Sequence, residues 1–129
     1  MIKYLVVHCS ASPQGRGDDA AVIHRWHRGK GWDGIGYNAV ITEAGVLQAG
    51  RPTYWQPAHV RGANDVSLGV CLIGQGGDAT EAQLAALREL LLDWTVEFPD
   101  AIVVGHADLD PNGKPNCPGF DVSSWFYDT

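Results

Sequence analysis

Residues 67–73, SLGVCLI, limit the possible fold more than any other part of the chain. They form a short, nearly continuous apolar run, which is typical of a central strand buried on both faces. Glycines at positions 74, 76 and 77 end this run. A strand of this kind predicts a sheet that is flanked by helices.

Other segments supply the rest of that sheet and the helices. Short runs rich in β-branched residues predict strands at residues 2–8, 37–42, 46–49 and 101–104, the middle two forming a hairpin. Helices are expected at residues 18–30, at residues 80–98 after a capping box, and in a short segment capped by Asp121. This order indicates an α/β fold with a mixed central sheet, and 129 residues predict a single domain, 1–129.

The charge of the chain excludes several classes of partner. Nine Lys and Arg residues against fifteen Asp and Glu give a net charge of -6. This is the wrong sign for a nucleic-acid groove or for docking on an anionic membrane. No apolar run approaches the ~18 residues of a membrane span, and the N-terminus lacks the pattern of a signal peptide. We therefore expect no nucleic-acid partner, no membrane insertion and a cytoplasmic location.

Two histidines follow predicted strands at equivalent points. His8 ends the first strand, and His106 comes after the strand at residues 101–104. If these strands are parallel, both imidazoles lie at the same edge of the sheet. Each histidine alone is more simply a polar strand-end residue, but the repetition points to a shared site.

Cys117 adds a third candidate, in the loop sequence Asn116-Cys117-Pro118-Gly119. A free cysteine usually occupies a buried apolar position, as Cys71 does, so a thiol in a polar loop needs another explanation. Two histidines and one cysteine with an open fourth position form a known catalytic zinc set. A nucleophilic pair of Cys117 with a histidine is the competing chemistry at this point.

Several short motifs in order resemble the type 2 N-acetylmuramoyl-L-alanine amidases, the zinc family of T7 lysozyme, AmpD-like enzymes and peptidoglycan recognition proteins. The resemblance runs from Tyr4 to Trp125 and is nearest to the short phage endolysins. Each motif is weak alone, and their order and spacing make the signal specific. The motifs are VHCSA at residues 7–11, IHRWH at 23–27, GW at 31–32, IGYN at 35–38, AH at 58–59, NDVSLGVCL at 64–72, GH at 105–106 and NCPGFD at 116–121.

The resemblance assigns roles to individual residues. It implies one Zn²⁺ per chain, bound by His8, His106 and Cys117 at the edge of the sheet, and a catalytic Tyr37 that stabilises the oxyanion. Phage members carry a Lys two residues before the cysteine ligand. This chain departs from that pattern, because the nearest lysine is Lys114, three residues before it. Lys114 is therefore the candidate oxyanion partner, with a solvated loop lysine as the alternative.

The resemblance and the loop positions suggest further contacts. His59 is expected to bind substrate or to orient a metal ligand, and a surface loop histidine is the alternative. Trp55, in the irregular stretch at residues 50–66, is the tryptophan expected to touch substrate. Cys9 is expected in the core, because its side chain alternates with that of His8. His24 and His27 are expected to be ordinary helix-face residues.

The activity that the resemblance implies is zinc-dependent hydrolysis of the amide between N-acetylmuramic acid and L-alanine in bacterial peptidoglycan. It suggests a monomeric phage or prophage endolysin that stays in the cytoplasm until host lysis. One alternative is a peptidoglycan-binding module without catalysis, which is disfavoured because Cys117 and Tyr37 are present. The other is a regulatory partner of a phage RNA polymerase. It is not expected, because the first strand begins at Ile2 without a preceding extension.

Overall fold

A five-stranded mixed sheet forms the centre of the protein. The computed structural model describes residues 1–113 and 116–128. The strand order is β3-β2-β4-β1-β5, in which β3 pairs antiparallel with β2 and the other neighbours are parallel. The strands are β1 (Tyr4–Cys9), β2 (Ala39–Ile41), β3 (Leu47–Ala49), β4 (Ser67–Leu72) and β5 (Ile102–Gly105).

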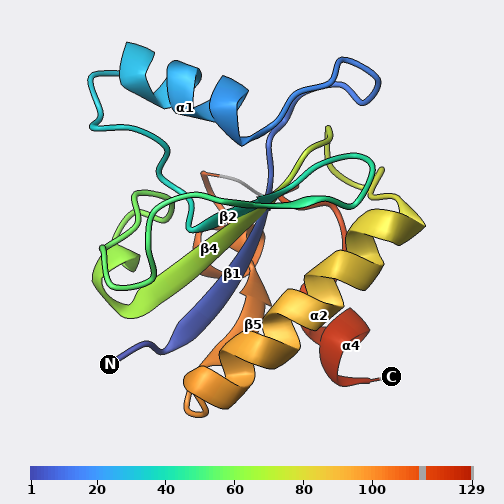
Figure 1. Cartoon of the computed structure of the whole chain (residues 1–129). Helices are drawn as coiled ribbons and strands as arrows, with labels where there is room; N and C mark the ends of the chain where they lie inside the picture. Colours follow the sequence, from blue (N-terminus) through green and yellow to red (C-terminus); the bar gives the residue numbers. More distant parts are fainter. Residues whose placement is uncertain (114–115, 129) are drawn as a thin grey trace.

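Helices cover both faces of this sheet. They are α1 (Ala20–Gly29), the 3₁₀ turn η1 (Asn64–Val66), α2 (Glu81–Glu97), α3 (His106–Leu109) and α4 (Val122–Tyr127). The helices α2 and α4 lie together on one side, and α1 lies apart from them (Figure 1). This confirms the predicted α/β fold with a mixed sheet flanked by helices. The short helix α3 is a difference, because its residues were predicted to be part of a loop.

The helix starts follow from their capping residues. Asp19 accepts a hydrogen bond from the backbone of Val22, and Thr80 forms the predicted capping box with Gln83. The side chain of Asp121 caps α4 by accepting a hydrogen bond from the backbone N–H of Ser124. These side chains satisfy backbone donors that a helix leaves unpaired at its first turn.

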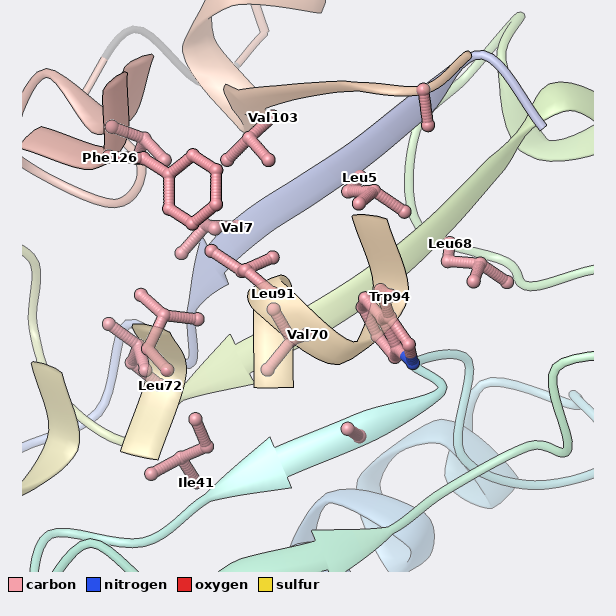
Figure 2. Close-up of a cluster of buried hydrophobic side chains, with 14 residues drawn as sticks. Leu5, Val7, Ile41, Leu68, Val70, Leu72, Leu91, Trp94, Val103 and Phe126 are labelled. Carbon is pink, nitrogen blue, oxygen red and sulfur yellow. The ribbon is translucent and has the colours of Figure 1, made fainter. Parts of the chain in front are cut away.

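The main hydrophobic core lies between the sheet and the pair α2 and α4. All six residues of β4 are buried, as the apolar run predicts. Leu5 and Val7 of β1 point into this core, which Leu91 and Trp94 of α2 and Phe126 of α4 close from the other side (Figure 2). Alternation along β1 therefore directs Val6 and His8 to the opposite face.

Replacement of Leu91 with Ala is expected to lower the free energy of unfolding by about 2–5 kcal/mol, because it leaves a cavity in this core. Leu91 is fully buried. Urea denaturation measures the change. Leu92→Ala is the matched control, because Leu92 is 52% exposed and should shift the value by no more than about 0.5 kcal/mol. Equal effects in the two variants would contradict this account of the core.

None of the helices in the described part of the chain is long and apolar enough to cross a membrane.

Candidate metal centre

His8, His106 and Cys117 converge at the carboxyl end of β1. One potential ligand atom from each residue lies within 4.8 Å of the others, and all three side chains are buried. The three residues come from the end of β1, the start of α3 and the loop that follows α3. The structure therefore brings the three predicted residues together.

Parallel pairing of β1 and β5 explains the meeting of the two histidines. Val7 pairs with Gly105, so the next residue of each strand, His8 and His106, lies at the same edge. Their ring centroids are 4.4 Å apart. Nε2 of His106 also lies 3.7 Å from a carboxylate oxygen of Asp110, which follows it by one helical turn.

Backbone contacts bring the loop of Cys117 to the same place. The N–H of Cys9 donates to Sγ of Cys117 at 3.2 Å, and the N–H of Ala107 donates to the Cys117 carbonyl at 2.9 Å. The neighbouring Cys9 thiol and burial raise the pKa of Cys117, and the N–H of Cys9 acts in the opposite direction. A bound metal ion would displace the thiol proton, because metals bind the thiolate. Two imidazoles and one thiolate fit Zn²⁺, whereas Mg²⁺ and Ca²⁺ prefer oxygen ligands.

The prediction that Cys9 lies in the core is wrong. Its side chain is partly exposed, and its Sγ lies 3.7 Å from Sγ of Cys117. Cys9 is the last residue of β1, lies beside the loop of Cys117 and is not among the buried residues of the main core. Alternation along the strand could not show that the core ends before Cys9.

A cavity of about 460 Å³ opens over the three candidate ligands. Tyr37 lines it, with its ring centroid 4.9 Å from that of His8. Burial raises the pKa of Tyr37 well above its ordinary value, so the phenol keeps its proton and can donate a hydrogen bond. Trp26, His27, Lys30 and Trp32 form the wall of the cavity on the side of α1.

His27 is a site residue that the sequence analysis missed. Its ring is buried, lies against Tyr37 at 5.5 Å and Trp32 at 4.5 Å, and accepts a hydrogen bond on Nδ1 from the N–H of Gly36. Burial, helped by the charge of Lys30, lowers the pKa of His27 to about 4. The signal was present, because His27 follows the buried Ile23 by four residues and so shares its helix face.

His24 lies in a different environment from His27. Its Nδ1 accepts a hydrogen bond from the N–H of Ile35 at 3.1 Å, and its ring packs over Gly34. It lines a second cavity, of about 390 Å³, which also holds Arg51 and Trp55. The guanidinium of Arg51 donates to the carbonyls of Ile35 and Gln56 and so links the segments that carry these two residues.

The remaining predicted residues have separate positions. His59 reaches the metal centre, with Nδ1 2.7 Å from Nε2 of His8, and burial lowers its pKa to about 3. Trp55 is 57% exposed and lines the second cavity and not the one over the candidate ligands. Lys114, the predicted oxyanion partner, lies outside the described residues. Among the described residues, Lys30 lines the metal cavity and lies over the ring of Trp32.

Comparison with known proteins gives consistent results. A family model described as N-acetylmuramoyl-L-alanine amidase matches residues 1–120. The endolysin of Klebsiella phage KP32 is 37% identical over 130 residues, which cover 95% of this chain and 83% of that protein. The endolysin of Escherichia phage T7 is 33% identical over 129 residues, with coverages of 95% and 83%.

A solved structure also matches over nearly the full length. The Ph2119 endolysin from Thermus scotoductus MAT2119 bacteriophage Ph2119 has a TM-score of 0.84 and 27% sequence identity, and the match covers 98% of this chain and 83% of that chain. The sequence and the fold therefore agree: this chain belongs to the N-acetylmuramoyl-L-alanine amidase family.

Proposed function

We propose that this protein is a zinc-dependent endolysin that hydrolyses the amide between N-acetylmuramic acid and L-alanine of peptidoglycan. The observation that carries the proposal is the convergence of His8, His106 and Cys117 within 4.8 Å beneath an open cavity, in a chain of the amidase family. The three residues hold one Zn²⁺ per chain. All of them come from the same chain, so a monomer suffices for a complete site.

Several groups around the metal site contribute to the proposed reaction. Zinc bound here supplies a Lewis acid for the scissile carbonyl and for water. Tyr37 donates its phenolic proton in a hydrogen bond to the carbonyl oxygen, which becomes negative in the transition state. The N–H of Cys9 holds the sulfur of Cys117 in position, so that the ligand does not swing into the cavity. Lys114 is retained as a second candidate donor to the same oxygen.

The substrate needs more surface than the metal cavity alone. The second cavity presents the exposed indole of Trp55 beside Arg51 and Asp33. We assign Trp55 to contact parts of the peptidoglycan that extend beyond the reacting amide. The contacts of His59 with His8 favour the orientation of a metal ligand over direct contact with substrate.

The relatives support a proposal for the domain and for the setting of the reaction. The chain matches the endolysins of phages KP32 and T7 over 95% of its length, so we assign residues 1–129 to one amidase domain. As an endolysin, the protein remains in the host cytoplasm until lysis and then reaches the cell wall.

The proposal is tested by digestion of purified sacculi followed by mass spectrometry. We expect free stem peptides that begin with L-alanine, together with glycan strands that lack peptide. Treatment with a chelator should stop their release, and added zinc should restore it. Cleaved glycan bonds with intact peptide side chains would refute the amidase assignment. Binding to sacculi without any release of peptide would instead support the alternative of a binding module.

A further inference from the structure

Three consecutive hydrogen bonds lead away from the candidate ligand His8. Nε2 of His8 lies 2.7 Å from Nδ1 of His59, and Nε2 of His59 lies 2.7 Å from Oγ of Ser67. The hydroxyl of Ser67 in turn donates to the backbone carbonyl of Ala63 at 2.7 Å. The chain of contacts thus ends on a group that can only accept.

That last acceptor sets the direction of every bond before it. The single proton of the Ser67 hydroxyl is used on the Ala63 carbonyl, so its oxygen accepts from Nε2 of His59. A neutral imidazole that carries its proton on Nε2 has a lone pair on Nδ1. Nδ1 of His59 therefore accepts, and Nε2 of His8 is the donor.

We propose that Ser67 and His59 fix His8 in the tautomer whose Nδ1 lone pair is directed to the metal. His59 is thus a positioning residue that acts through His8. The Ala63 carbonyl, which can only accept, determines which group donates in each of the three hydrogen bonds. The inference rests on the proposed zinc site and adds which nitrogen of His8 binds and what selects it. A hydrogen bond donated by a metal-bound histidine through its other ring nitrogen fixes the ring orientation and raises the basicity of the ligand.

The surrounding backbone is built to hold the ring of His59. Oδ1 of Asn64 accepts from the N–H groups of His59 and Val60, both at 2.9 Å, and so fixes the loop that carries the imidazole. The ring lies directly over Gly69 of β4, where an added Cβ would collide with Nδ1 and Cε1 of His59. Gly69 therefore leaves the space that lets His59 reach across the sheet to His8.

Zinc affinity, measured by competition with a chromophoric chelator, tests the role of each link. His59→Ala and Ser67→Ala are expected to weaken zinc binding by about 10–100-fold. His59→Asn places an amide oxygen near the position of Nδ1, so it should recover most of the lost affinity. His24→Ala is the matched control, because His24 lies in the second cavity, and it should bind zinc like the parent. Parental affinity in both His59→Ala and Ser67→Ala would overturn the inference.

A spectroscopic measurement on the parent protein needs no variant to fold. Long-range ¹H–¹⁵N correlation spectra of the zinc-loaded protein should show the proton of His8 on Nε2, and the proton of His59 on Nε2 with a bare Nδ1. A proton on Nδ1 of His8 would overturn the inference even if zinc binds tightly. Failure of the parent to bind zinc would instead refute the proposed function, and the tautomer of His59 in the metal-free protein would still be measurable.

Discussion

The protein with Cys117 replaced by Ala is expected to lose nearly all of its zinc and its peptidoglycan hydrolysis. Structural zinc sites bind with about 10–16 kcal/mol, so removal of one of three protein ligands should cost roughly a third of such a value, or about a thousandfold in affinity. Metal analysis after dialysis against a weak chelator measures the zinc retained per chain. The fold should survive, because Cys117 does not belong to the main core.

Cys71→Ala provides the matched control for this experiment. Cys71 is a fully buried cysteine of β4 that does not belong to the candidate ligand group. We expect this variant to keep one zinc per chain despite some loss of stability. Full zinc retention by Cys117→Ala would remove the assigned ligand set, whereas loss of zinc from both variants would indicate a general defect in folding.

Replacement of Tyr37 with Phe is expected to retain zinc and to reduce kcat by about 10²–10³-fold. The phenyl ring preserves the packing against His8 and His27, while the donor to the developing oxyanion is lost. Initial rates of peptide release, compared at equal zinc occupancy, measure the effect. Such a donor acts mainly in the transition state, so KM should change much less than kcat.

Tyr54→Phe is the corresponding control, because Tyr54 is 83% exposed and should leave the rate unchanged. A parental turnover for Tyr37→Phe would rule out the oxyanion role. Lys30, which lines the cavity, would then be the next donor to test by substitution.

The strand-end histidines were predictable from sequence because parallel strands align their ends. The register of Val7 with Gly105 places His8 beside His106, as that reasoning requires. The order of the five strands was not predictable, because pairing between distant segments depends on contacts that no single segment encodes. Cys117 could be named a candidate ligand from its polar loop, but its approach to the histidines could not be inferred from spacing, since backbone contacts with Cys9 and Ala107 hold its loop.

The positions of two residues could not be inferred from the sequence, for different physical reasons. Cys9 lies beyond the end of the core, beside Cys117, and a pattern of alternation does not show where the core ends. The contacts of His59 depend on the conformation of the stretch at residues 50–66 and on the empty space over Gly69. Neither can be inferred from residue spacing, so the link between His59 and His8 required the structure.

The arrangement of the two sheet faces affects how the protein can be attached to other materials. Helix α2 packs on the face that Leu5 and Val7 supply, and its outer side carries the exposed Leu92 and Val96. The metal cavity lies on the other face, beside α1. A surface tether or fused protein joined through the outer side of α2 would therefore leave the entrance free, which is valuable when the substrate is an insoluble polymer larger than the enzyme.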